Sequence, residues 1–99
     1  MKHREGIIIM GELRNETADR GVTSRQVARR AIAQGYLEPP IDEKTVCEVS
    51  KCIHDLREAG DAYVVDDSSR AYKYDLTEWG EKYYEWLRSR YEKFPPERV

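Results

Sequence analysis

Long apolar runs are missing from this sequence. No run of apolar residues exceeds four, as at Ile7 to Met10, and 36% of all residues are charged. A helix that spans a bilayer needs about 20 apolar residues, and the apolar core of a signal peptide needs about 7 to 15. The sequence therefore predicts a cytoplasmic protein with no membrane segment and no secretion signal.

Cysteine and histidine are scarce, with two of each. Cys47 and Cys52 are five residues apart, which on a helix turns their side chains about 140° from each other and prevents a local disulfide. Cys47 and His54 are two helical turns apart, about 10 Å along the axis, which is too far to share a zinc ion. The sequence has no CxxC, HExxH, P-loop or glycine-rich nucleotide motif. We therefore expect inert, reduced thiols, no metal, no cofactor and no enzymatic activity.

The sequence also lacks a large excess of charge of either sign. The sequence has 17 Lys and Arg against 19 Asp and Glu, so its net charge is -2. A strongly basic balance is the usual mark of a nucleic-acid-binding domain, and any basic surface here must therefore be local. The length of 99 residues fits one domain, which we place at 1–94 with a frayed tail at 95–99.

Three helices are predicted in the first part of the chain. The first spans about 4–15. Thr23, three residues before Gln26, forms a capping box that begins the second helix. Asp42 is a natural N-cap for the third and strongest helix, 43–59. The residues expected to face the core from these helices are Ile9, Met10, Leu13, Val27, Ala28, Ala31, Ile32, Val46, Val49, Ile53 and Leu56.

The hydrophobic period then changes from that of a helix to that of a strand. Tyr63 and Val65 alternate with Val64, and apolar residues alternate with polar ones over 72–76. The polar segment 66–70 between them is typical of a hairpin loop. Thr77 is placed to cap a last helix over 78–94. The predicted order is helix, helix, helix, hairpin, helix, which is a mainly α, α+β fold.

The last helix is rich in aromatic residues. We expect four of its residues to form core contacts over the first helix, namely Trp79, Tyr83, Trp86 and Leu87. Three further aromatic residues exceed what so small a core needs, namely Tyr84, Tyr91 and Phe94. Because tyrosine is favoured at interfaces, the sequence predicts a homodimer with its seam at these three residues.

Three segments carry a resemblance to a known family. Residues 53–64 (IHDLREAGDAYV) look like the end of a recognition helix that runs into a wing strand. Residues 74–80 (YDLTEWG) resemble the Y-x-L-T-x-x-G exit from the wing, and 23–31 (TSRQVARRA) is similar to the T-S-x-x-[IV]-A second helix. Together they resemble winged helix-turn-helix transcriptional regulators of the MarR and PadR kind. The resemblance implies a winged-helix fold and binding to double-stranded DNA.

The resemblance places the predicted helix 43–59 in the major groove. Side chains on its solvent face that could read bases or contact phosphate are Lys44, Thr45, Glu48 and Lys51. Candidate phosphate contacts on the second helix are Ser24, Arg25, Arg29 and Arg30. On the hairpin, Arg70 and Lys73 could follow the backbone, although Asp66 and Asp67 beside them would repel it.

We therefore predict a small transcriptional regulator that occupies an operator sequence. The main alternative is a winged helix used for contact with a protein partner, which the acidic pI near 5.7, the acidic wing tip and the surplus tyrosines favour. A component of a mobile element or phage would use the same DNA contacts for another purpose. Each candidate side chain also has a plainer interpretation as ordinary solvated surface.

Overall fold

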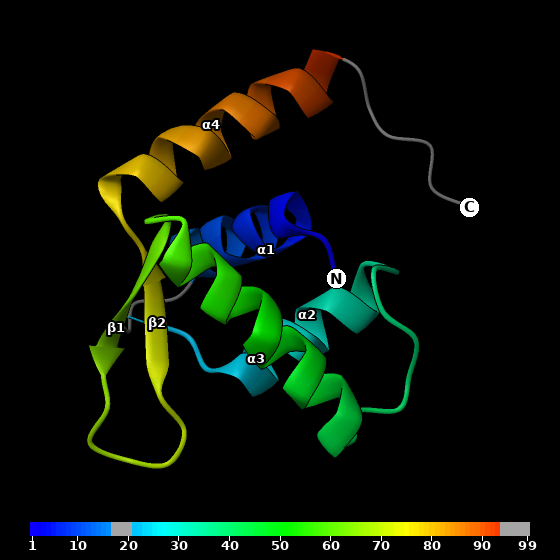
Figure 1. The fold of residues 1–99 in the computed structure, drawn as a ribbon. Helices are drawn as coiled ribbons and strands as arrows, with labels where there is room; N and C mark the ends of the chain where they lie inside the picture. The colour runs from blue at the N-terminus through cyan, green and yellow to red at the C-terminus, as the bar shows by residue number, and fades with distance from the viewer. Residues whose placement is uncertain (17–20, 94–99) are drawn as a thin grey trace.

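The computed structural model describes residues 1–16 and 21–93, with side chains as far as residue 90. Its elements are α1 (His3–Glu16), α2 (Ser24–Ala33), α3 (Glu43–Glu58), β1 (Ala62–Asp66), β2 (Lys73–Leu76) and α4 (Glu78–Lys93). Figure 1 shows α2 and α3 as a helix-turn-helix, with the β1–β2 hairpin beside them as the wing. The predicted order of elements and the α+β winged-helix fold are confirmed.

Local chemistry fixes the ends of the helices as predicted. The Thr23 hydroxyl accepts from the Gln26 N–H at 3.2 Å, and the Gln26 side chain accepts from the Thr23 N–H at 2.8 Å, which completes the capping box. Asp42 caps α3 by accepting from the Thr45 N–H at 2.8 Å. This bond and a second one from the Thr45 hydroxyl lower the pKa of the Asp42 carboxyl. Gly60 follows α3 with a φ of 83°, a left-handed conformation that favours glycine.

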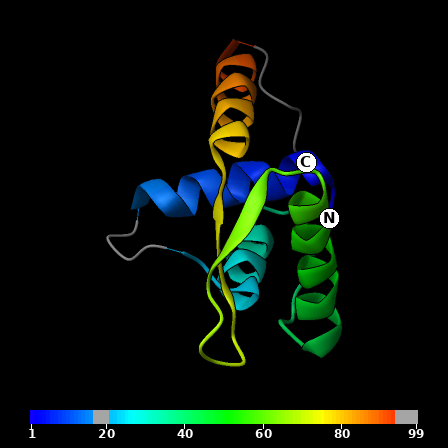
Figure 2. The same cartoon turned by 60° about the vertical axis from the view of Figure 1, so that its left-hand side comes forward.

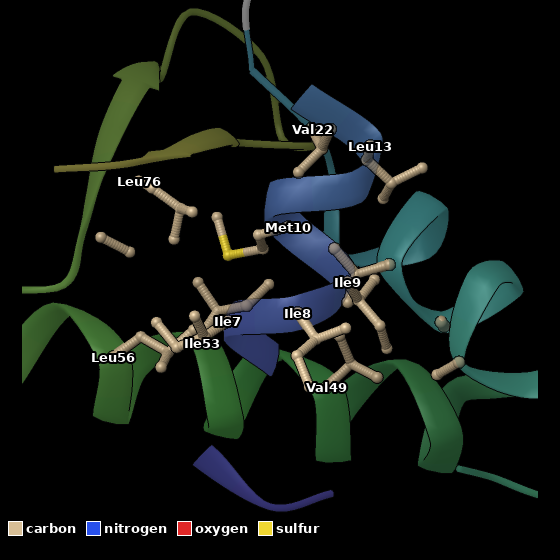
Figure 3. Close-up of a cluster of buried hydrophobic side chains, with 14 of the residues drawn as sticks. Ile7, Ile8, Ile9, Met10, Leu13, Val22, Val49, Ile53, Leu56 and Leu76 are labelled. Carbon is tan, nitrogen blue, oxygen red and sulfur yellow. The ribbon is translucent and has the colours of Figure 1, made fainter. Parts of the chain in front are cut away.

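The helix α1 lies at the centre of the domain. It contacts α2, α3, α4 and β2, and Figure 3 shows its side chains packed between α3 and the hairpin. Its residues from Gly6 to Gly11 are all buried. A helix covered on every side has no polar face, so the isoleucine run gives only a weak helical period in the sequence.

The wing is a two-stranded antiparallel hairpin with a third, very short partner. Ala62 pairs with Leu76 and Val64 pairs with Tyr74, and the register shifts between Val64 and Asp66. Val22 exchanges two backbone hydrogen bonds of 2.8 Å with Tyr74. The segment that leads into α2 is thereby attached to the wing, which holds the helix-turn-helix and the hairpin in one frame.

The prediction that both tryptophans of α4 lie in the core is wrong. Trp79 is 72% exposed and Trp86 is 56% exposed, whereas Leu87 is buried as expected. The helix packs on α1 through a different face, on which the Tyr84 ring lies directly against Gly11. The absence of side chains at glycines allows this close approach, and it turns the tryptophan stripe outward.

Tyr84 therefore makes contacts within the chain, although we predicted it at a dimer seam. It is half-buried and packs against the hydrophobic core. The Tyr91 side chain and Phe94, the other two residues predicted there, lie outside the described residues. Tyr83, predicted in the core, is half-buried at its edge, as are Ile32 and Val46.

No helix among the described residues is both long and apolar enough to cross a membrane. In that same part of the chain, no three His, Cys, Asp or Glu side chains come together in a way that could hold a metal ion.

Candidate nucleic-acid interface

A groove lies where the helix-turn-helix meets the wing. It has a volume of about 300 Å³, and three elements contribute its walls. Its lining residues are Thr23, Ser24 and Arg25 at the start of α2, Val46 and Ser50 on α3, and Arg70, Ala71, Tyr72 and Tyr74 on the hairpin. Figure 2 shows the wing loop and the first turn of α3 at the end of the molecule opposite α4.

The floor of this groove is polar and fixed in position. The Ser50 hydroxyl donates to the Ser24 hydroxyl at 2.9 Å, which joins the middle of α3 to the first residue of α2. Sequence reasoning had not selected Ser50, because it lies at the border of the apolar stripe of α3. Tyr72, 43% exposed beside the groove, was also missed as a candidate, since its place in the strand pattern suggested packing only.

Five of the predicted cations are exposed to an external anion, and two of them, Arg25 and Arg70, line the groove. Arg25 and Arg29 on α2, Lys44 and Lys51 on α3, and Arg70 in the wing loop are all exposed. None of the five forms an ion pair with a carboxylate among the described residues. Exposed cations without an ion pair among the described residues therefore occur on α2, α3 and the wing despite the net charge of -2.

Arg30 does not belong to this free set. Its guanidinium forms ion pairs with two carboxylates of α1, that of Glu12 at 3.2 Å and that of Glu16. The hydrogen bond to Glu16 is the main cause that raises the pKa of Arg30 and lowers that of Glu16. Arg30 therefore connects α2 to α1. Its guanidinium is occupied by these two carboxylates, although we predicted that it would contact phosphate.

Thr45 and Glu48 also have partners within the chain. The Thr45 hydroxyl donates to the Asp42 carboxylate at 2.9 Å and contacts the Pro40 carbonyl oxygen at 3.2 Å, so it completes the N-cap of α3. The Glu48 carboxylate lies 3.1 Å from the amino group of Met1. Both groups are thus engaged within the chain, whereas Lys44 and Lys51 are exposed and form no ion pair among the described residues.

The wing loop carries both signs of charge. Asp66 and Asp67 are exposed, as are Ser68 and Arg70, and Lys73 is half-buried where β2 begins. The Asp66 carboxylate accepts from the Ser68 N–H at 2.9 Å, and hydrogen bonding by Ser68 lowers the pKa of Asp66. Because this carboxylate stays ionised, the tip repels phosphate and only the Arg70 side of the loop attracts it.

The two cysteines occupy opposite environments. Cys47 is exposed on the same face of α3 as the two lysines. Cys52 is buried, its thiol lies 3.7 Å from the Lys2 carbonyl oxygen, and burial raises its pKa.

Comparison with known proteins bears on the fold. No family model matches this chain, and no curated protein matches it. Among solved structures, the crystal structure of SSV1 F-93 is similar, with a TM-score of 0.56 over 95% of this chain and 91% of that chain, at 17% sequence identity. An identity this low supports a shared fold and nothing finer, so the resemblance to the MarR and PadR regulators stays a prediction. By its elements and by this likeness, the chain is a winged-helix protein.

Proposed function

We propose that this protein binds duplex DNA and acts as a small transcriptional regulator by occupying its site. The observation that carries the proposal is that Arg25 of α2 and Arg70 of the wing line one groove whose third wall is α3, the helix that also exposes Lys44 and Lys51. Arg25 and Arg70 are distant in sequence and both are exposed, so packing of the core does not account for their meeting at one groove.

The recognition element would be α3. In a helix-turn-helix, the N-terminal part of the second helix enters the major groove, which is about 12 Å wide and admits one helix. That part of α3 exposes Lys44, Cys47, Glu48 and Lys51. A lysine in this position can donate to guanine or to phosphate, whereas the Glu48 carboxylate would first have to release the Met1 amino group before it could accept from cytosine N4.

Phosphate contacts would come from the two flanks of α3. Arg25 lies in the first turn of α2, where the positive end of the helix dipole adds to its own charge. Arg70 lies across the groove on the wing. Contacts of this kind orient a protein on the duplex without reading its sequence, and Arg29 on the exposed side of α2 would extend them.

Titration of a fluorescent mixed-sequence duplex, followed by anisotropy at low and near-physiological salt, tests the proposal. We expect micromolar binding that weakens steeply with salt, because about four neutralised phosphates give a slope near -3.6 in log K against log salt. Arg25→Ala and Lys51→Ala should each weaken binding about five- to tenfold. Arg88→Ala, which removes the same charge from the opposite end of the molecule, should leave binding unchanged.

Two outcomes would contradict this assignment. A protein that does not bind even at low salt lacks the proposed activity, and the interpretation as a protein-binding winged helix would replace it. Binding that Arg25→Ala and Lys51→Ala leave intact would place the DNA on some other surface.

Alkylation of the thiols gives a second, independent measurement. We expect Cys47 to react readily with iodoacetamide and Cys52 to react only slowly, because Cys52 is buried and its pKa is raised. Saturating duplex DNA should slow the reaction of Cys47 severalfold, as judged by mass spectrometry of the peptides. Cys52 serves as the internal control, and a Cys47 rate that DNA leaves unchanged would argue against α3 as the recognition helix.

The alternative of a protein-binding winged helix has one specific observation in its favour. Trp79 and Trp86 are both exposed on α4, far from the groove. The exposure of these two tryptophans is compatible with DNA binding at the other end of the molecule. DNA binding at the groove does not, however, explain why they are exposed.

A further inference from the structure

Three exposed residues of α3 form one ridge on the helix that the proposed function places in the major groove. Lys44 and Lys51 are seven residues apart, which on a helix is nearly two full turns and about 10.5 Å along the axis. Cys47 lies between them, one turn from each, and all three side chains are exposed. Neither lysine forms an ion pair among the described residues. We call these three residues the α3 ridge.

The polar side chains next to the α3 ridge already have partners within the chain. The Ser50 hydroxyl donates to the Ser24 hydroxyl at 2.9 Å, and the Thr45 hydroxyl completes the N-cap of the helix. The Glu48 carboxylate lies 3.1 Å from the N-terminal amino group. Glu43, the first residue of α3, is exposed and forms no ion pair in the described part of the chain. In this half of α3, two ammonium groups and one carboxylate are therefore available to an external partner.

The composition of α3 favours one class of base pair. Its sequence, EKTVCEVSKCIHDLRE, contains no asparagine and no glutamine. In the major groove adenine presents an acceptor at N7 and a donor at N6, and an amide side chain is the group that satisfies both. Guanine presents two acceptors, N7 and O6, which suit a lysine, and cytosine presents the N4 donor, which suits a carboxylate. The side chains that α3 offers therefore match a G·C pair and not an A·T pair.

We propose that α3 recognises G·C pairs, with Lys44 and Lys51 each donating to the O6 and N7 atoms of a guanine and Glu43 accepting from a cytosine N4. This inference rests on the proposed DNA binding and adds a base preference to it. Base pairs stack about 3.4 Å apart, so a separation of about 10.5 Å along the helix places the two guanines about three base pairs apart. The short side chain of Cys47 between the lysines lets the α3 ridge approach the base edges.

Competition between duplexes of equal length tests the base preference. The duplexes share their flanks and differ only in a central block of about six base pairs, which is G·C, A·T or inosine·C. Inosine lacks the guanine N2 amino group, so an inosine·C pair presents the major-groove atoms of G·C and the minor-groove atoms of A·T. We expect the G·C and inosine·C duplexes to displace a fluorescent mixed-sequence duplex at concentrations about tenfold lower than the A·T duplex.

Variants of the ridge assign the preference to its residues. Lys44→Ala and Lys51→Ala should each lower the G·C preference severalfold, and the variant carrying both should bind the three duplexes almost equally. Arg25→Ala is the matched control, because a phosphate contact carries no sequence information. It should weaken binding to all three duplexes by the same factor and leave the preference intact. All three positions are exposed, so the circular dichroism spectrum of each variant should equal that of the parent.

The possible failures are distinguishable. Equal binding of the three duplexes, or tighter binding of the A·T duplex, would overturn the base preference and leave the proposed DNA binding in place. An inosine·C duplex that binds like the A·T duplex would also overturn it, because the preference would then arise in the minor groove. A G·C preference that survives the double lysine substitution would contradict the assignment to the α3 ridge. A protein that binds none of the duplexes would overturn both this inference and the proposed function.

Discussion

Replacing Gly80 with alanine is expected to lower the free energy of unfolding by about 2 kcal/mol. A Cβ atom at this position would collide with the backbone carbonyl oxygen of Asp61. That carbonyl cannot move aside cheaply, because it also accepts from the Thr77 N–H at 2.9 Å, while the Thr77 hydroxyl donates to the Gly60 carbonyl at 2.6 Å. The start of α4 is thus attached to the turn between α3 and β1.

Thermal unfolding followed by circular dichroism would measure this effect as a melting temperature lower by about 10 °C. Alanine stabilises a helix by up to about 1 kcal/mol relative to glycine. A lower stability of Gly80→Ala would therefore be measured in spite of this opposing effect. Ser89→Ala is the matched control, because Ser89 is exposed on the same helix and should keep the stability of the parent. A Gly80→Ala protein as stable as the parent would show that α4 does not approach the turn this closely.

Replacing Arg14 with alanine is expected to cost about 2 kcal/mol of stability at neutral pH. The Asp75 carboxylate is buried, and it lies 3.4 Å from the Arg14 guanidinium nitrogen Nε. Replacement of Arg14 removes one cation from this carboxylate, which also accepts from the Leu76 N–H at 2.8 Å, and the loss of a partner from a fully buried ion pair costs about 3 to 5 kcal/mol. We expect the smaller cost of about 2 kcal/mol because the Arg14 side chain is 35% exposed, so solvent screens part of its interaction with Asp75.

A double-mutant cycle by chemical denaturation isolates this interaction. The combination of Arg14→Ala with Asp75→Asn should be more stable than Arg14→Ala alone, since the neutral amide does not need the cation that Arg14→Ala removes. Arg14→Lys should retain part of the stability because it keeps a cation on α1. If the two substitutions are simply additive, Arg14 acts through its contact with Glu81 and not through Asp75.

The sequence predicted the features that depend on neighbouring residues. The capping box of Thr23 and Gln26, the N-cap at Asp42 and the alternation of the hairpin are local patterns, and the structure contains each of them. These caps and strand patterns were sufficient to predict the order of elements, and hence the winged-helix fold.

The prediction from sequence was wrong for the last helix, where two faces fitted the helical pattern of buried residues equally well. The last helix carries two stripes with helical spacing, offset by one residue: Trp79, Tyr83 and Trp86 on one, and Gly80, Tyr84 and Leu87 on the other. The choice between them depends on Gly11 and Gly80, whose missing side chains allow Tyr84 and the Asp61 backbone to come close. That information lies in distant contacts, so the tryptophans were assigned to the wrong side.

At the candidate interface, too, the sequence predicted what depends on neighbouring residues and missed what depends on distant contacts. Arg25 and Lys51 were identified correctly as exposed cations because they face away from an apolar stripe. Arg30 fits that description equally well in the sequence, but its partners Glu12 and Glu16 belong to another helix. Which cations remain available to DNA therefore depends on tertiary packing, and it could not be predicted from residue type and spacing.

The central position of α1 has a consequence for how the chain is made. This helix precedes every element that covers it, and its apolar residues lie on all sides. During synthesis its surface stays open until the hairpin and α4 have emerged, because partial domains cannot bury it. Until α4 has emerged, the apolar surface of α1 is thus open to contacts with other chains, which favour aggregation.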